Sequence, residues 1–228
     1  MSISILIVYD TRGGNTARMA RHVARGVEGV PGSEAVLRAV PRVGARTEPR
    51  IEEIPESGAP YVENADLARC DGLILGSPTH FGNMSASLKH FLDGTTEQWL
   101  GGTLAGKPAA AFCSTGSQHG GNEATLLSMM VPLLHHGMLI CGLPYTHPGL
   151  MKTTRGGTPY GASHVSGESG DAPLEETEAA LCALLGERVA SFARRLARSG
   201  DGPDRDAGVT ANGARGNAGG DTEAGERP

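Results

Sequence analysis

Apolar residues along the chain follow two alternating patterns, one typical of strands and one typical of amphipathic helices. Strand-like runs cover residues 3–9, 34–40, 71–78, 107–115 and 138–143. Short apolar runs of this kind suit parallel strands that are covered on both faces. After the first run, small and apolar residues recur at helical spacing, namely Met19, Ala20, Val23, Ala24 and Val27. The pattern returns after Met84 and over residues 122–137 and 174–199.

Strands that alternate with helices in this way predict an α/β fold with a doubly wound parallel sheet. Five strands in a chain of 228 residues fit the flavodoxin-like order 2-1-3-4-5, with helices on both faces. Two segments interrupt the alternation. Residues 41–70 contain four prolines and are expected to be irregular, and residues 143–171 form a long insertion rich in Gly and Pro.

Composition divides the chain into two parts. Residues 1–198 are expected to form one domain with an ordinary soluble core, since 39% of the chain is hydrophobic and 20% is charged. Residues 199–228 are rich in Gly and contain Val209 as their only large aliphatic residue, with no aromatic. Such a stretch buries too little apolar surface to offset its ordering entropy, so it is predicted to be a disordered tail.

Charge and cysteine usage exclude several classes of protein. The formal net charge is −5 and no basic stripe is visible, which argues against nucleic acid as a partner. No apolar run approaches ~18 residues, so no membrane insertion is expected. The first residues predict a strand and not a signal peptide, and a cytoplasmic location follows. The four cysteines lack metal-type spacing, so no metal site is expected.

The stretch VYDTRGGNTARMARHVARGV, residues 8–27, joins a strand to a helix through a loop of Thr and Gly. Backbone N–H groups at a helix N-terminus favour an anion, and Thr11 and Thr16 add hydroxyl donors. The Lys of a Walker loop is missing, and so is the GxGxxG of a dinucleotide site. A phosphatase-like loop would need Arg where His119 stands, six residues after Cys113. A terminal monophosphate such as that of FMN remains, beside the alternative of a turn that binds nothing.

Two further loops follow the third and fourth predicted strands, and in this fold they lie at the same end of the sheet. Residues 77–94 offer Pro78, Phe81 and a glycine, which let a flat ring approach closely. Residues 114–123 offer small polar side chains and backbone amides for the polar edge of an isoalloxazine ring. Three such loops at one end of the sheet favour a ligand site.

Three strings of residues carry a family resemblance: GSPTHFGNMSASLKHFLD, LLHHGM and RGGTPYGASHVSG. Over roughly residues 2–198 the chain resembles the WrbA family of NAD(P)H:quinone oxidoreductases. The resemblance implies a flavodoxin-like fold, non-covalent FMN, and transfer of two electrons from NADH or NADPH to quinones. It also implies a homotetramer whose active sites are completed by neighbouring subunits.

The same resemblance assigns residues to the site. The phosphate loop becomes Thr11, Arg12, Gly13, Gly14, Asn15 and Thr16. The loop at the flavin edge becomes Pro78, Thr79, His80, Phe81, Gly82 and Asn83. The second ring loop becomes Ser114, Thr115, Gly116, Ser117, Gln118, His119 and Gly120. The resemblance places Trp99 at the substrate pocket, His136 beside the flavin and Tyr145 near the same pocket.

The cofactor carries the difficult chemistry in such a protein, so no catalytic triad is required. Phe81 and Trp99 are expected to form a flat apolar slot for the substrate, and His136 or Tyr145 to supply a proton or polarise the quinone oxygen. For His136 a purely structural role at a helix C-terminus is an equal alternative. An electron-transfer flavodoxin and a non-enzymatic flavin-binding scaffold remain alternatives for the whole protein. The near-neutral body argues against the first of these, because carriers use a strongly charged docking face.

Overall fold

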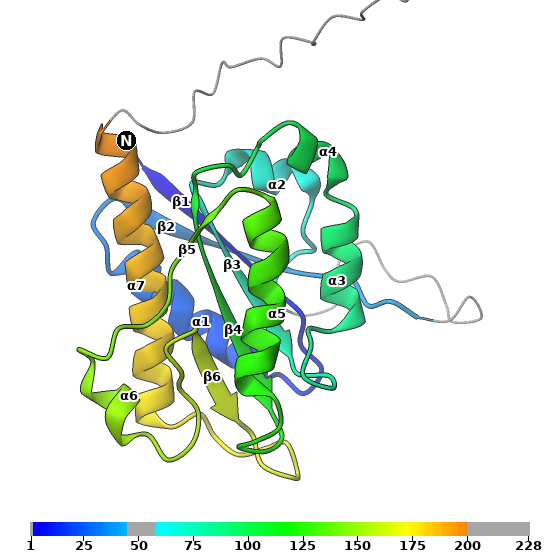
Figure 1. Ribbon diagram of the computed structural model, residues 1–228, viewed down its shortest axis with the longest axis vertical. Coiled ribbons are helices and arrows are strands. Elements are labelled where there is room, and N and C mark those ends of the chain that lie inside the picture. Colours follow the sequence, from blue (N-terminus) through cyan, green and yellow to red (C-terminus); the bar gives the residue numbers. More distant parts are fainter. Residues whose placement is uncertain (1, 45–57, 200–228) are drawn as a thin grey trace, which may run out of the picture.

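The computed structural model describes residues 2–44 and 58–199. A parallel sheet with the path β2-β1-β3-β4-β5 lies between two layers of helices (Figure 1). The strand order predicted from the sequence is therefore confirmed. Helices α1 and α7 cover one face, and α2, α3 and α5 cover the other. In the described part of the chain, no helix is long and apolar enough to cross a membrane.

The bounds of the elements follow the predicted pattern with a few differences. The strands are β1 (Ile3–Tyr9), β2 (Ser33–Ala39), β3 (Gly72–Pro78), β4 (Pro108–Thr115), β5 (Leu139–Ile140) and β6 (Ala162–Val165). The helices are α1 (Asn15–Glu28), α2 (Asn64–Arg69), α3 (Ala86–Asp93), α4 (Thr96–Leu100), α5 (Asn122–His135), α6 (Pro148–Lys152) and α7 (Glu176–Ser199). Apart from Ser199, which ends α7, the predicted tail lies outside the described residues.

Two predictions about local structure were wrong. The segment from residue 41 to 70 was expected to be irregular throughout, but α2 forms within it, where Asp66 and Glu63 build a reciprocal capping box. The fifth strand was expected over residues 138–143, but β5 pairs with only the first residues of β4. The backbone turns away after it, because Leu143 N–H donates to Pro159 O and not to β4.

The edge position beside β4 is filled by two short strands. β5 pairs with Pro108 and Ala109, whereas β6 pairs with Phe112 to Thr115. The insertion after β5 therefore leaves the sheet and returns to it further along the same edge. β6 was missed in the sequence because the string around it is rich in Gly and polar residues, and its apolar pattern is only four residues long.

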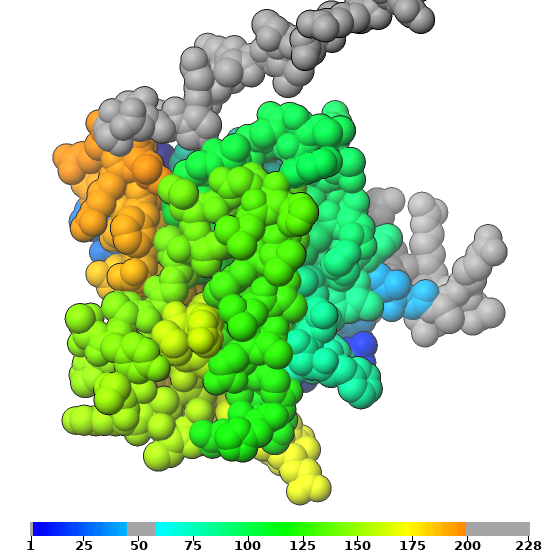
Figure 2. All heavy atoms as spheres, in the orientation of Figure 1, coloured from blue at the N-terminus to red at the C-terminus, as the bar shows by residue number. Residues whose placement is uncertain are grey.

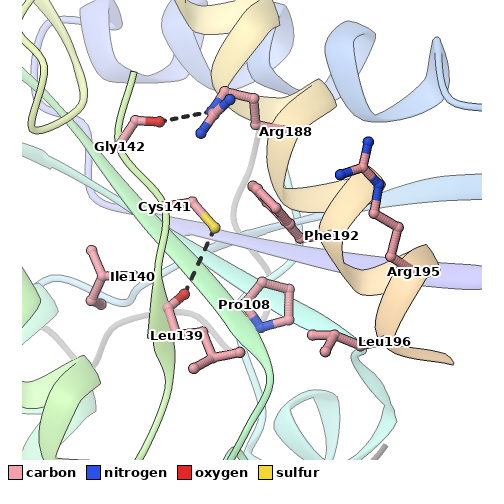
Figure 3. Close-up of a pocket in the computed structure, with 9 residues that line it drawn as sticks. All are labelled: Pro108, Leu139, Ile140, Cys141, Gly142, Arg188, Phe192, Arg195 and Leu196. Atoms are coloured by element: carbon pink, nitrogen blue, oxygen red, sulfur yellow. Dashed lines mark hydrogen bonds between the residues drawn. The ribbon is translucent and has the colours of Figure 1, made fainter. Parts of the chain in front are cut away.

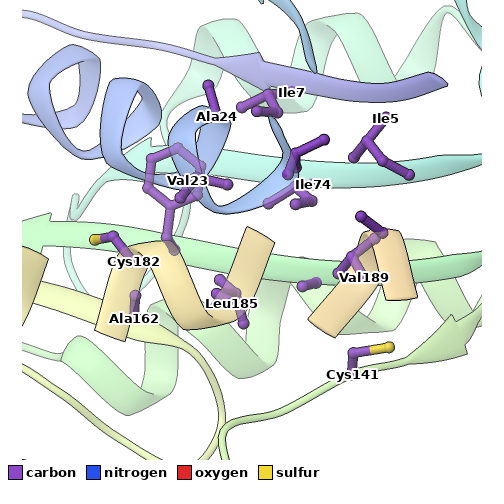
Figure 4. Close-up of a cluster of buried hydrophobic side chains, with 14 of the residues drawn as sticks. Ile5, Ile7, Val23, Ala24, Ile74, Cys141, Ala162, Cys182, Leu185 and Val189 are labelled. Atoms are coloured by element: carbon purple, nitrogen blue, oxygen red, sulfur yellow. The ribbon is translucent and has the colours of Figure 1, made fainter. Parts of the chain in front are cut away.

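Burial explains which strands occupy the centre. Every residue of β4 is buried, and β1 and β3 are nearly so, whereas β2 at the edge is only half-buried. The core on the α1–α7 side contains Ile5, Ile7 and Ile74 from the sheet and Val23, Leu185 and Val189 from the helices (Figure 4). A Cβ at residue 76 would lie 2.2 Å from the ring of Phe112, so only glycine fits at this position.

Helices α1 and α7 cross at backbone contact distance. A Cβ on Gly26 would lie 1.8 Å from the carbonyl oxygen of Ala183 on α7. A Cβ on Gly186 would lie 2.0 Å from the carbonyl oxygen of Val23 on α1. Glycine at both positions lets the two helices approach more closely than side chains allow, and this contact holds the N-terminus of α1 in place.

The variant Gly26→Ala is expected to lower the free energy of unfolding by about 1–3 kcal/mol, because the new methyl group overpacks a backbone contact. Helix propensity alone would make the alanine variant more stable, by about 1 kcal/mol in the free energy of unfolding. The sign of the measured change therefore distinguishes overpacking from helix propensity. Gly29→Ala, at the residue that directly follows the same helix, is the control, since its Cβ would lie 3.4 Å from the nearest atoms. Urea unfolding of both variants measures the difference. A Gly26→Ala protein as stable as Gly29→Ala would contradict the close crossing.

Candidate functional site

The three predicted loops lie at the carboxyl ends of β1, β3 and β4, which are neighbours in the sheet. Parallel strands place these ends at one edge, where β6 also ends (Figure 1). The first loop leads into α1 and the third leads into α5, so two helix N-termini point at the same region. Ligands of this fold bind at this edge of the sheet.

The loop between β1 and α1 presents unpaired donors. The residue before α1 is Gly14, with φ 83°, and no described side chain caps the helix. Its first N–H groups therefore remain available to an anion, which the helix dipole also favours. Thr11 Oγ1 is buried and has no hydrogen-bond partner within residues 2–44 and 58–199. A Cβ on Gly13 or Gly14 would meet nothing within 4 Å, so the loop borders open space.

A turn after β6 closes one side of this loop. Asn15 Nδ2 donates to Gly170 O at 2.8 Å, and Arg18 donates to Asn15 Oδ1. The turn is tied to β4 as well, because both the N–H and the hydroxyl of Ser166 donate to Thr115 O, at 2.8 and 2.9 Å. Sequence reasoning missed Ser166, Gly170 and Arg18, because only the folded chain brings them beside the loop.

A buried carboxylate holds the segment that carries this turn. Glu178 accepts backbone N–H groups from Gly156, Val165 and Glu175 at 2.9–3.1 Å, and His164 Nδ1 lies 2.8 Å from its Oε2. Burial alone would raise the pKa of Glu178, but these hydrogen bonds, led by that from His164, hold the pKa below its ordinary value. Hydrogen bonds to the Glu178 carboxylate therefore fix the conformation of the string RGGTPYGASHVSG.

The second loop is a tight turn that projects an aromatic ring. His80 and Asn83 exchange backbone hydrogen bonds of 2.9 and 3.0 Å, and the two residues between them have positive φ, 52° for Phe81 and 73° for Gly82. Two such residues form the turn type that closes tight hairpins. The side chain of Phe81 is fully exposed. His80 Nε2 is buried without a partner among the described residues.

The third loop packs against the second through two glycines. Gly121, with φ 98°, precedes α5, and a Cβ there would lie 2.8 Å from Gly82 Cα. Thr115 Oγ1 donates to Ser117 O at 2.8 Å and lies 3.2 Å from Asn122 Oδ1, which shapes the start of the loop. Residues 116–119 are exposed. Gly121 and Asn122 lie within the predicted loop of residues 114–123 but were not among the residues assigned individually to the site, although a Gly-Gly-Asn string before a helix is a visible signal.

Hydrogen bonds also couple the second and third loops. Thr79 N–H donates to Ser114 O at 2.8 Å, and Thr125 Oγ1 donates to Thr79 Oγ1 at 3.1 Å. Pro78 pairs with Ser114 in the sheet register. The two loops therefore form one wall, and the loop between β1 and α1 lies at the end of the neighbouring strand β1.

Trp99 and His136 lie at the other end of the molecule. α5 starts at the loop edge and runs for 14 residues, about 20 Å, before His136 follows it. Trp99 Nε1 donates to His135 O at 2.8 Å, and His136 Nε2 lies 3.0 Å from Thr95 Oγ1. Figure 1 shows α4, which carries Trp99, at the end opposite to β6. Within one chain these residues do not meet the three loops.

The protonation state of His136 follows from its partners. Thr95 Oγ1 donates its proton to Leu92 O at 2.7 Å, so it accepts from His136 Nε2–H. Nδ1 is then the unprotonated nitrogen, and it is buried without a partner in the described part of the chain. Burial, followed by the charge of His135, lowers the pKa of His136, which favours the neutral ring.

Tyr145 follows β5 on the connection to α6 and is exposed. No described hydrogen bond joins its hydroxyl group to His136 or to Trp99, so the structure does not bring together the two predicted proton donors. Within residues 2–44 and 58–199, no three His, Cys, Asp or Glu side chains gather as a candidate metal site.

The loops fit FMN in their chemistry. The unpaired Thr11 hydroxyl and the uncapped N-terminus of α1 suit a terminal phosphate. The exposed ring of Phe81 and the backbone groups of residues 116–119 suit a flat ring with a polar edge. The glycine contact brings the second and third loops together, and the β1–α1 loop lies at the end of the neighbouring strand.

Comparison with known proteins shows which family this chain resembles. The model of a family described as NADPH-dependent FMN reductase matches residues 1–145. An NAD(P)H dehydrogenase (quinone) of Solidesulfovibrio magneticus is 40% identical over 206 residues, which cover 85% of this chain and 99% of that protein. Another of the same name, from Geotalea daltonii, is 41% identical over 205 residues, 85% of this chain and 98% of that protein.

Among solved structures, a flavodoxin, WrbA-like protein from Agrobacterium tumefaciens is 26% identical, with a TM-score of 0.57. The match covers 85% of this chain and 99% of that one. The family match includes all three loops, and the relatives extend it over most of the chain. The chain belongs to the WrbA family of flavodoxin-like NAD(P)H:quinone oxidoreductases, within the group described as NADPH-dependent FMN reductases.

Proposed function

We propose that the protein uses FMN to catalyse the two-electron reduction of quinones by NADH or NADPH. The observation that carries this proposal is the buried, unpaired Thr11 hydroxyl beside the uncapped N-terminus of α1, next to a wall built by two further loops. The names of the relatives, at about 40% identity over almost their whole length, support quinone as the acceptor.

Thr11, Thr16 and the backbone N–H groups at the start of α1 hold the phosphate in this proposal, and residues 78–83 and 114–120 hold the ring. FMN, when bound, accepts a hydride from the nicotinamide and passes two electrons to the quinone. Phe81, fully exposed on its tight turn, supplies an apolar surface for a flat molecule. The rigid hydrogen bonds of the His80–Asn83 turn keep that surface in place.

We further propose that Trp99 and His136 act on the flavin of another subunit. They lie about one helix length from the loops of their own chain, so only a second copy can bring them to a flavin. The exposed face of α5 supports such an assembly, because Leu127, Val131 and Leu134 are exposed at helical spacing beside Trp99 and Leu100. Figure 2 shows α5 running down the middle of one open face of the molecule.

His136 has a defined role in this arrangement. With Nε2–H donated to Thr95, the lone pair of the neutral ring is on Nδ1. Because Nδ1 is buried in its own chain, it accepts a hydrogen bond from another subunit only after the side chain shifts. It can donate a proton to a quinone oxygen only after taking one up, which the lowered pKa makes less favourable. Tyr145 is the other predicted proton donor, and its exposure leaves its hydroxyl group free to face a neighbouring subunit.

Replacing both Thr11 and Thr16 with Val is expected to weaken FMN binding by at least about a hundredfold. Each hydrogen bond to a charged phosphate contributes about 1.5–3 kcal/mol, and valine keeps the shape while removing the donor. The control is Thr154→Val, at an exposed threonine after α6. Titration of FMN into the apoprotein, followed by flavin fluorescence, gives both affinities. An unchanged affinity in the double variant would show that this loop does not bind the phosphate.

Two inactive variants should restore activity when they assemble together. The Thr11→Val, Thr16→Val protein lacks FMN, and a Trp99→Ala, His136→Ala protein lacks the distant residues. Co-expression with different affinity tags yields mixed assemblies, in which the FMN of one copy faces the intact Trp99 and His136 of another. Quinone-dependent NADH oxidation should then exceed that of either parent severalfold. Mixed assemblies no faster than the parents, or a monomeric wild type in light scattering, would rule out sharing of the site.

Donor and acceptor are expected to use the flavin in turn, since all three loops border one site. Initial rates with NADH and benzoquinone varied together should give parallel lines in double-reciprocal plots, the pattern of a ping-pong reaction. Intersecting lines would instead require both substrates to be bound at once. Absence of any quinone-dependent oxidation by the FMN-loaded protein would favour the electron carrier or the scaffold.

A further inference from the structure

A cleft of about 480 Å³ opens between the sheet edge at β5 and the C-terminal half of α7 (Figure 3). Its walls are mainly apolar and include Pro108, Leu139, Cys141, Phe192 and Leu196. The size and the apolar lining are typical of pockets that enclose a small organic molecule. The described residues that line it include no Asp or Glu.

The cleft is separate from the three loops of its own chain. Pro108 is the first residue of β4 and Thr115 is the last, so the strand separates them by about 23 Å. The cleft therefore lies toward the amino end of β4, on the side of the sheet that α7 covers. Neither the flavin nor the residues proposed to hold it reach this place within one subunit.

Arg188 supplies positive charge that is fixed in position. Its Nε donates to Gly142 O at 2.8 Å, and its guanidinium carbon lies 5.4 Å from the centre of the Phe192 ring. These contacts hold the planar group at the Gly142 end of the cleft, as Figure 3 shows. Its two Nη groups have no hydrogen-bond partner among the described residues. Burial raises the pKa of the Cys141 thiol, so that wall carries no competing negative charge at neutral pH.

We propose that this cleft binds a small amphipathic monocarboxylate, with the carboxylate on the Nη groups of Arg188 and the apolar chain along Cys141 and Phe192. A guanidinium held by its Nε still presents two parallel donors, which match the two oxygens of a carboxylate. The apolar walls favour a ligand whose body is hydrocarbon, and the absence of acidic residues from the described lining favours a negative head group.

Calorimetric titration of the FMN-loaded, full-length protein with sodium octanoate tests this site. Affinity should rise about fourfold for each methylene from hexanoate to octanoate, because each buried CH₂ adds about 0.8 kcal/mol. The uncharged companion, 1-octanol, should bind at least about tenfold more weakly than octanoate. Arg188→Gln should weaken octanoate by at least about tenfold and leave octanol within twofold. The control is Arg194→Gln on the same helix, whose side chain instead donates to Pro31 O.

The comparison of octanoate with octanol uses the wild type alone, so it holds even where Arg188→Gln fails to fold. Octanoate that does not bind at 5 mM (about the weakest level calorimetry measures), or that binds no better than octanol, overturns the proposal. Equal binding to wild type and to a folded Arg188→Gln protein overturns it as well. Octanoate that binds only after the assembly is diluted to monomers would show that a second copy covers the cleft, and would also overturn it.

Discussion

The ring of Phe112 occupies the space where residue 76 would carry a side chain. Gly76 and Phe112 are register partners in the centre of the sheet, and Tyr9 pairs with Gly76 on the other side. A Cβ at residue 76 would overlap the ring at 2.2 Å, so β1, β3 and β4 can align in this way only with glycine there. The same alignment sets Pro78 beside Ser114. The position of the loops relative to one another depends on that contact.

Close backbone contacts also position the elements between the core and the site. Gly26 and Gly186 let α1 and α7 touch, which positions the uncapped start of α1. Gly82 and Gly121 let the second and third loops touch. Glu178 accepts hydrogen bonds from three backbone N–H groups and contacts His164, and so holds the segment whose end closes the loop between β1 and α1. A site made of backbone donors needs such anchoring, because its donors cannot adjust by rotating side chains.

The candidate site residues lie in two groups, one at each end of α5. One end borders the loops that suit a flavin, and the other carries His136 and, through a hydrogen bond, Trp99. A helix of 14 residues is too long for both to meet within one chain. The exposed apolar side of the same helix gives copies of the chain a surface on which to associate. Separation and exposure are together the reasons for the proposal that the enzyme acts as an assembly.

The sequence by itself determined the alternation of strands and helices, the central position of the continuous apolar runs and the three loops, because these follow from local periodicity and from the placing of Gly, Thr and Pro. The strand order came from the fit of five alternating strands to the known order of this fold. It also contained the signal for Gly121, in a Gly-Gly-Asn string before a helix. Only the tertiary structure decided that β6 completes the edge left by β5, that Gly170 binds Asn15 beside the β1–α1 loop while Ser166 ties the same turn to β4, and that Arg188 borders a cleft. Each of these joins residues far apart in the chain through hydrogen bonds or packing, and local patterns carry no information about such partners.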